Sequence, residues 1–485
     1  MQREFILNLL LLLLINLLVK PAFIFGIDLG VQNRLPPGDY GLYFTLLNFT
    51  YLFQIIGDFG LQSFNNRHVS QHPNLVGKYL PVLLLLKLLL GAFYFVIAAA
   101  AAHWVAGYEG RAMHLLFVLL FNQVLAQAIL FLRSNLSGLG YYRLDSALSS
   151  LDKLLMLLTC GALLWYLPPT YLSAEAFAWA QTLALGSSLI CVGLVLRAKM
   201  PTKKLFSSVV SRRWMGMLVV LFRASFPYAL VILLMSAYTR LDAVLLERLL
   251  PNGRYHADVY AGAYRLLDAA NMLGYLFASL LLPMFARLLA RGEDPRPLTG
   301  LAFRLMWTVS VLLVLLVFFL RTDLLQMMMP QRADAYRWNT LGLLIWAFIP
   351  MGITHVFSTL LTADGRLFAM SRFFAVGLVL DVALDLWLIP RHQALGAAMA
   401  AVSTQTFVAV SMVALCVHRF NWRLSGALIG PFIAYGATLL ALSALLVHTQ
   451  GSALVISLLL ATGGVLTAVA CGLLPLKRMM RFRWK

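Results

Sequence analysis

Apolar stretches of eighteen or more residues recur along the whole chain of 485 residues, and they constrain its fold more than any other feature. Each stretch is long enough for a helix to cross the hydrocarbon core of a bilayer, which is roughly 30 Å thick. Inside lipid every backbone N–H and C=O group must be paired within its own segment, so these stretches are expected to be helical. A β-barrel is disfavoured because barrel strands alternate apolar and polar residues over about ten positions, whereas these runs are continuous.

The composition indicates an integral membrane protein and excludes a soluble enzyme. Hydrophobic residues make up 61% of the chain and charged residues only 12%, compared with roughly 25% charged residues in an ordinary soluble domain. We therefore predict an all-α polytopic membrane protein with about fourteen transmembrane helices. The predicted spans are residues 5–29, 40–63, 79–102, 113–137, 147–167, 172–196, 222–247, 259–287, 298–320, 340–362, 367–389, 394–417, 427–447 and 452–474.

Basic residues are distributed unequally between the two sides of the predicted membrane region. With fourteen spans, the side that carries both termini holds 25 Lys and Arg residues and the opposite side holds 8. Because cytoplasmic loops carry the excess of Lys and Arg, both termini are predicted to lie in the cytoplasm. The net charge of +19 does not indicate nucleic acid binding, since the basic residues form no stripe with interleaved aromatic residues.

Two turn motifs repeat at similar spacing in the two halves of the chain. Leu35-Pro36-Pro37-Gly38 returns as Leu250-Pro251-Asn252-Gly253 some 215 residues later, and Leu167-Pro168 returns as Ile389-Pro390 at an offset of 222. Such spacing indicates two homologous six-helix halves, related by an axis along the membrane normal. The predicted divisions are an N-lobe at 1–197, a basic cytoplasmic linker at 198–221, a C-lobe at 222–420, and two further helices with a basic tail at 421–485.

Sequence signatures of enzymes are missing. The chain contains no P-loop, no G-x-S-x-G and no H-E-x-x-H, so neither ATP-driven transport nor familiar hydrolytic chemistry is supported. The four cysteines lie in apolar runs without a C-x-x-C pair, and we interpret them as small core residues. We therefore expect no enzymatic activity, no cofactor and no bound metal other than a coupling ion.

Several motifs resemble the bacterial polysaccharide and O-antigen flippases. In the first half, Leu35-Pro-Pro-Gly-Asp-Tyr-Gly-Leu-Tyr43 is followed by Gly57-Asp-Phe-Gly-Leu61. The motifs of the second half occur in the family's order: Tyr238-Thr-Arg-Leu-Asp242, Tyr260-Ala-Gly-Ala-Tyr-Arg-Leu-Leu-Asp268, Leu282-Pro283 and Gly396-Ala-Ala-Met-Ala400. The resemblance covers the first twelve predicted spans, while the last two match only in number and in being apolar.

The resemblance implies a fold and a substrate. These flippases belong to a superfamily that also contains the lipid II flippase and the multidrug and toxin extruders, in which two six-helix bundles form a V-shaped cavity open to alternate sides. The implied substrate is an oligosaccharide carried on a polyprenyl diphosphate in the bacterial inner membrane. The implied partners are membrane lipids and the polysaccharide polymerase machinery.

Two other functions stay open. One is an ion-coupled multidrug or metabolite antiporter on the same fold. The other is a membrane enzyme that polymerises or ligates glycans, but it would need a sizeable outer loop. The longest predicted outer loop, about 321–339, has fewer than twenty residues.

Cationic residues within the spans are candidates for contacts to the diphosphate. A charged side chain at mid-membrane costs about 2.5–3.5 kcal/mol on insertion scales, so it usually faces a cavity or a partner. Lys20, Arg240 and Arg265 are such residues, and a diphosphate requires a cationic pocket. Pairing with buried carboxylates such as Asp58 or Asp268 is the alternative.

Two further lysines are expected to have little functional importance. Lys87 and Lys153 lie near the predicted cytoplasmic ends of their spans. A long lysine side chain in such a position can extend its ammonium group to the interface. Replacing Lys87 by alanine is therefore expected to be nearly silent.

Three carboxylates at comparable depth are candidates for ion coupling. Asp242 belongs to the seventh span, and Asp381 and Asp385 belong to the eleventh. A spacing of four residues places the last two on one helix face with Cβ atoms roughly 5–6 Å apart. Both cannot stay charged and unpaired at low dielectric, so either a cation neutralises them or one holds a proton. A bridge from these carboxylates to Arg240 or another buried cation is the structural alternative.

The resemblance to the lipid II flippase extends this hypothesis. A sodium site there is formed by equivalent helices, with a hydroxyl from the next span that Ser403 or Thr404 could supply here. Asp381 stands where an amide is expected, which leaves Na⁺ and H⁺ as alternatives for the coupling ion.

Overall fold

The computed structural model describes residues 18–19, 21–62, 65, 76–199, 213–422, 426–447 and 452–474. Within these residues every regular element is a helix and none is a strand. Each of the fourteen predicted spans contains a helix in the described part of the chain. The predicted all-α fold is therefore confirmed.

Nine of the described helices are long and apolar enough to cross a bilayer. Two shorter apolar helices, Gly430–Leu446 and Val455–Ala470, follow near the C-terminal end. These lengths and this apolar character support a multi-pass membrane protein, since a helix of about twenty residues covers the hydrocarbon core.

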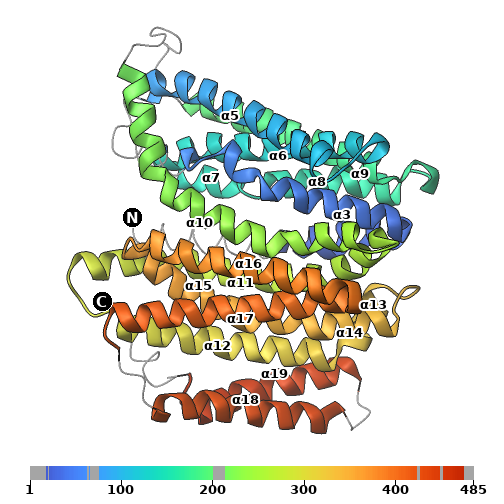
Figure 1. Cartoon of the computed structure of the whole chain (residues 1–485), viewed down its shortest axis with the longest axis vertical. Coiled ribbons are helices and arrows are strands. Elements are labelled where there is room, and N and C mark those ends of the chain that lie inside the picture. The colour runs from blue at the N-terminus through green and yellow to red at the C-terminus, as the bar shows by residue number, and fades with distance from the viewer. Residues whose placement is uncertain are drawn as a thin grey trace. The chain divides into compact units, whose positions relative to one another are not determined.

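The first compact unit comprises Met1–Asp258. Helix α9 packs against both α6 and α8, and α3 packs against both α6 and α10 (Figure 1). Its elements are η1 (Ala22–Asp28), α2 (Leu29–Arg34), α3 (Pro37–Leu52), η2 (Gln54–Gly57), α5 (Val76–Trp104), α6 (Gly110–Gly138), α7 (Tyr142–Leu148), α8 (Leu151–Trp165), η4 (Pro169–Tyr171), α9 (Ala174–Lys199), α10 (Arg213–Leu249) and the first turn of α11 (Gly253–Ala290).

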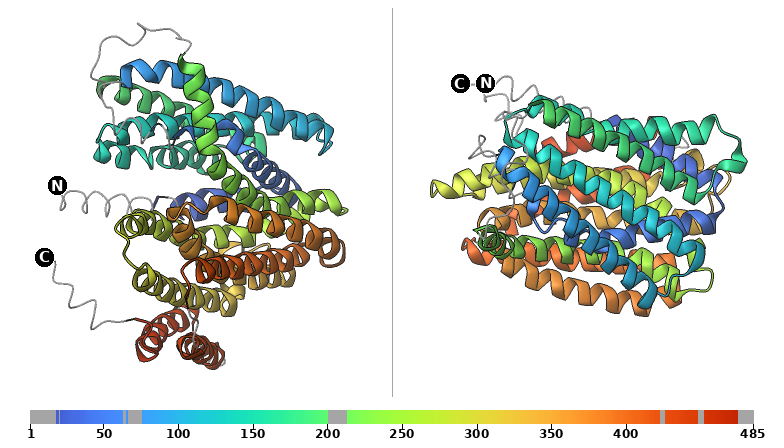
Figure 2. Two further views of the ribbon diagram at one scale, coloured as in Figure 1. Left: turned by 60° about the vertical axis from the view of Figure 1, so that its left-hand side comes forward. Right: turned by 90° about the horizontal axis from the view of Figure 1, so that it is seen from above.

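The second compact unit comprises Val259–Lys485 and contains the rest of α11. Consecutive helices α16 and α17 form its most extensive helix pair, and α15 packs against α17 (Figures 1 and 2). Its further elements are α12 (Arg296–Phe319), α13 (Arg321–Met328), α14 (Ala335–Leu344), η5 (Ile345–Ala347), α15 (Phe348–Ala363), α16 (Leu367–His392), α17 (Ala394–Arg419), α18 (Gly426–Val447) and α19 (Ala453–Ala470).

The last two helices, α18 and α19, pack against α12 in the second unit. Val311 and Leu315 of α12 form a buried cluster with Tyr435 and Leu439 of α18. The Tyr435 hydroxyl donates a hydrogen bond to the carbonyl of Thr308 at 3.1 Å. This bond satisfies a polar group that would otherwise be costly within the apolar cluster.

The division between the compact units falls within α11, between Asp258 and Val259. The predicted lobes divide instead at the linker 198–221, most of which lies outside the described residues. The predicted lobe boundaries therefore stay a prediction.

Two of the turn motifs quoted above make very close helix–helix connections. A Cβ atom on Gly253 would lie 2.3 Å from the Glu247 carbonyl oxygen, and one on Gly396 would lie 2.3 Å from the Leu388 carbonyl oxygen. Any larger residue would force the backbone apart at either turn. These glycines thus position the ends of α10 and α16 against the helices that follow.

The second span is broken, whereas the sequence predicted one continuous helix over 40–63. Helix α3 ends at Leu52, and the short 3₁₀ helix η2 follows. Phe59 and Gly60 then have positive φ angles of 47° and 80°. The break exposes backbone groups that need partners inside the membrane region.

Candidate functional site

Asp381 and Asp385 lie on α16 in the second unit, where both residues are fully buried. Carboxylate oxygens of the two side chains come within 4.8 Å of each other. The surrounding helix sequence is almost entirely apolar, so little solvent screens the two groups. Two carboxylates at this separation repel each other strongly unless a proton or a cation neutralises one of them.

The neighbouring helix α17 supplies a buried hydroxyl at nearly the same level. A Cβ atom on Gly377 would contact Val408 at 2.9 Å and Thr404 at 3.9 Å. Gly396 of α17 likewise meets Leu388 of α16, so the two helices run antiparallel. Thr404 therefore lies at a level between Gly377 and Asp381. Among the described residues, the buried Thr404 Oγ1 has no hydrogen-bond partner.

Ser403 does not belong to this arrangement, although the sequence offered it as the alternative hydroxyl. Its side chain is exposed, and its hydroxyl donates to the carbonyl of Met399 at 2.8 Å. Consecutive helical residues point about 100° apart, and Thr404 is the one buried beside α16. Of the two hydroxyls, the structure thus places that of Thr404, and not that of Ser403, in the buried contact between α16 and α17.

The oxygen atoms of this second-unit cluster suit a small hard cation. Carboxylate and hydroxyl oxygens are the ligands that hard cations prefer. Thr404 Oγ1, which has no hydrogen-bond partner among the described residues, adds a further oxygen that could serve as a ligand. The chemistry of these oxygens is compatible with a cation or a proton, and the use of Asp381, Asp385 and Thr404 as an ion site stays a prediction.

Asp242, the third predicted carboxylate, lies on α10 in the first unit and is also buried. Its burial in a span agrees with the expectation that a charged residue there has a specific role. Its participation in one site with α16 stays a prediction.

The predicted substrate cations have different surroundings. Lys20 lies outside the described residues. Arg265 is buried on α11 in the second unit. Arg240 of α10 donates from Nη1 to Asn48 Oδ1 of α3 at 3.2 Å, and its guanidinium lies 5.1 Å from the Tyr51 ring centroid. Arg240 is thus held by a polar and aromatic contact between α3 and α10.

Lys87 is not a snorkelling residue, and that prediction is wrong. The side chain is only 6% exposed and forms an ion pair with Asp58 at 2.7 Å. The ammonium group also donates to the Gly57 carbonyl at 2.8 Å and to Gln127 Oε1 at 3.5 Å. The physical reason is the break in the second span, because it frees a carbonyl that needs a buried donor.

Glutamine side chains complete this Lys87–Asp58 network. Gln127 Nε2 donates to the Gln54 carbonyl at 2.9 Å, and Gln123 Nε2 donates to Gln54 Oε1 at 3.0 Å. A Cβ atom on Gly57 would lie only 2.2 Å from Gln127 Oε1. The motif Gly57-Asp-Phe-Gly thus forms a polar break in an otherwise apolar span.

A polar contact on α11 was missed by the sequence reasoning. Asn271 Oδ1 lies 2.7 Å from Nε2 of His355 on α15, and the His355 ring meets the Tyr275 ring edge-on at 4.9 Å. The sequence does contain a signal for it, because polar residues recur every three or four positions in this span: Arg265, Asp268, Asn271 and Tyr275. Such spacing gives α11 one polar face within its span.

A protein-family model described as "polysaccharide biosynthesis protein" matches residues 6–289. No curated protein matches the sequence.

Several solved structures share the fold. An inward-facing multidrug resistance MATE family transporter of the MOP superfamily has a TM-score of 0.68 and 15% identity, with 82% of this chain and 94% of that chain covered. The lipid II flippase MurJ in an inward closed conformation has a TM-score of 0.65 and 12% identity, with 96% and 100% covered. A MOP superfamily transporter from Pyrococcus furiosus, described as having a binding pocket of reverse polarity, has a TM-score of 0.61 and 15% identity, with 85% and 95% covered. These likenesses confirm the predicted fold class.

Proposed function

The chain belongs to the polysaccharide biosynthesis protein family, and from this membership we propose that it is a flippase for a lipid-linked oligosaccharide. It moves an oligosaccharide on a polyprenyl diphosphate across the bacterial cytoplasmic membrane by alternating access, for assembly of a cell-surface polysaccharide. The family match is the observation that carries the proposal. The fold supports it further, because one similar structure is named a lipid II flippase.

The same proposal includes a location and a direction. The unequal distribution of Lys and Arg supports cytoplasmic termini, with the substrate taken up from the cytoplasmic leaflet and released to the outer leaflet. Membrane lipids surround the protein, and a polysaccharide polymerase would consume the exported glycan.

Cationic residues within the spans support a diphosphate substrate. Arg265 is buried on α11 and Arg240 is half-buried on α10, and guanidinium groups bind phosphate oxygens in a bidentate way. An apolar cationic drug would be repelled by such groups. Lys20 is proposed as the third diphosphate contact from its sequence position.

The acidic pair on α16 is proposed to couple transport to an ion gradient. Asp381, Asp385 and Thr404 would hold Na⁺ or H⁺, and the bound ion would relieve the repulsion between the carboxylates. Asp242 is proposed to contribute in the conformation that binds the ion. The protein would then favour one conformation when the ion is bound to the pair and another when it is not, and coupling requires this difference.

Surface glycan in the native bacterium tests the substrate. We expect Arg265→Ala to abolish surface polysaccharide while full-length protein still reaches the membrane, with lipid-linked oligosaccharide accumulating inside. Arg265→Lys should keep part of the export if a point charge suffices. Normal surface glycan in a strain that carries only Arg265→Ala would remove this residue from the mechanism.

An ion-coupled multidrug antiporter is the second candidate, favoured by the MATE family fold likeness and by the acidic pair. Resistance to cationic dyes separates the two functions. Wild-type protein that confers dye resistance, in a strain whose surface glycan does not depend on it, would support the antiporter.

A further inference from the structure

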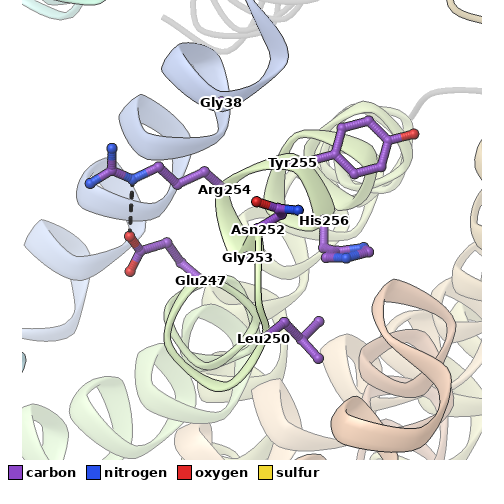
Figure 3. Close-up of a pocket in the computed structure, with 8 residues that line it drawn as sticks. All are labelled: Gly38, Glu247, Leu250, Asn252, Gly253, Arg254, Tyr255 and His256. Atoms are coloured by element: carbon purple, nitrogen blue, oxygen red, sulfur yellow. Dashed lines mark hydrogen bonds and ion pairs between the residues drawn. The ribbon is translucent and has the colours of Figure 1, made fainter.

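A pocket of about 690 Å³ lies where α10 ends and α11 begins, in the first unit. Figure 3 shows this pocket, with Glu247 and Arg254 joined by an ion pair on one side and the rings of Tyr255 and His256 on the other. The volume falls within the range of about 300–1,000 Å³ that is usual for ligand pockets. None of these residues has a role in the site described above.

Close packing holds the pocket in shape. Asn252 has a positive φ of 57° in the turn between the two helices. Gly41 of α3 meets the turn closely, since a Cβ atom there would lie 1.8 Å from the Arg254 carbonyl oxygen. Gln32 Nε2 donates to both the carbonyl and Oδ1 of Asp258 at 2.9 Å, which secures the next turn of α11.

Glu247 and Arg254 offer an acceptor and donors side by side. The Glu247 side chain is 6% exposed. Its Oε2 atom forms an ion pair with Arg248 Nε at 3.0 Å and accepts a hydrogen bond from the Tyr108 hydroxyl at 3.3 Å. Its Oε1 atom accepts from Arg254 Nε at 3.3 Å. A carboxylate has about four acceptor positions, so Oε1 can accept another bond. The Arg254 side chain is 50% exposed, so its terminal N–H groups are accessible to a ligand.

This combination suits hydroxyl groups better than phosphate. A hydroxyl can donate to Glu247 Oε1 and accept from Arg254 at the same time, whereas a phosphate dianion can only accept and cannot use the remaining acceptor positions of Glu247. The Asn252 amide can both donate and accept, and the Tyr255 ring supplies an apolar face for the C–H groups of a sugar ring. The pocket therefore matches a ring that carries several hydroxyls.

We propose that this pocket binds a sugar residue of the exported oligosaccharide on the outer side of the membrane. The inference rests on the proposed function, and on the predicted topology that places the α10–α11 turn opposite the cytoplasmic termini. The first unit would then hold the glycan after it has crossed.

Binding of soluble glycans to the full-length protein in nanodiscs tests the proposal. The probes are fluorescently labelled neutral oligosaccharides, three to five sugars long, without lipid or diphosphate, and the readout is fluorescence anisotropy. Arg254→Met removes the donors, and Asn252→Gly removes the amide while keeping the positive φ. Arg291→Met is the matched control, because Arg291 is another exposed arginine in a helix–helix turn, 3.7 Å from Glu293.

We expect saturable binding of at least one oligosaccharide, unchanged in the control. Arg254→Met should weaken it about tenfold, as the loss of a hydrogen bond to a charged group implies, and Asn252→Gly about threefold, because the Asn252 amide is neutral and exposed. Inorganic pyrophosphate should not displace the sugar. No binding by any probe, equal binding by the variants, or displacement by pyrophosphate would overturn the sugar pocket. Flipping by the wild-type protein is measured separately, so intact flipping with no sugar binding refutes the pocket and leaves the flippase proposal standing.

Discussion

Replacing Lys87 by alanine should destabilise the protein strongly. Removing one partner of a buried ion pair costs about 3–5 kcal/mol, because the remaining charge stays buried without compensation. Asp58 is 24% exposed, so solvent screens it in part, and the lower end of that range applies. The Gly57 carbonyl loses its lysine donor as well, which adds about 1 kcal/mol. We therefore expect a loss of about 3–4 kcal/mol in the free energy of unfolding.

Denaturation of the purified protein in mixed detergent micelles measures this loss. Lys199→Ala is the control, because Lys199 is exposed at the end of α9. Its only ring contact among the described residues is with Tyr141 at the surface, 5.6 Å from the centroid, so it should change stability by no more than about 1 kcal/mol. The double variant Lys87→Met with Asp58→Asn removes both charges and should recover most of the stability. A Lys87→Ala variant as stable as Lys199→Ala, or a double variant no more stable than Lys87→Met alone, would refute the reasoning.

Three further predictions concern the break, the ion site and the topology. Gly57→Ala should cost about 1–2 kcal/mol in stability by displacing Gln127 from its hydrogen bonds, whereas Gly186→Ala, with no atom within 4 Å of the added Cβ, should be neutral. Asp385→Asn and Thr404→Val should reduce the dependence of transport on a Na⁺ or pH gradient without loss of expression, whereas Ser403→Ala should behave as wild type; unchanged gradient dependence in both variants would make the acidic pair structural. A reporter active only in the periplasm should give no signal when fused after Lys485, and activity there would reverse the predicted orientation.

The positions of the spans could be predicted from the sequence because they depend on local hydropathy alone. A helix over 367–389 needs only a continuous apolar run, and α16 follows that run closely. Asp381 and Asp385 could likewise be placed on one face, since helical periodicity puts residues four apart together.

The break in the second span could not be predicted in the same way. Residues 40–63 are apolar enough for one helix, and the partner that stabilises the break, Lys87, is 29 residues away from Asp58. Its depth in the membrane depends on where α5 begins relative to the break, which is a property of tertiary packing. Local pattern alone made Lys87 look like a residue at the interface.

The choice between Ser403 and Thr404 depended on packing as well. Both are hydroxyl residues at the same depth of α17, and the sequence contains no signal for which face meets α16. The close approach of α17 to Gly377 buries Thr404 and leaves Ser403 exposed. The Asn271–His355 bond similarly depends on the contact between α11 and α15.

Translocation of a lipid-linked oligosaccharide by the purified protein in liposomes tests the central proposal most directly. A fluorescent oligosaccharide on a polyprenyl diphosphate is placed in both leaflets, and a membrane-impermeant quencher reports the fraction that exchanges. We predict nearly complete quenching in vesicles with wild-type protein, and quenching of only the outward-facing half in empty vesicles and with Arg265→Ala. Wild-type vesicles that quench only half of the label, while accumulating a cationic dye in response to an ion gradient, would contradict the flippase account.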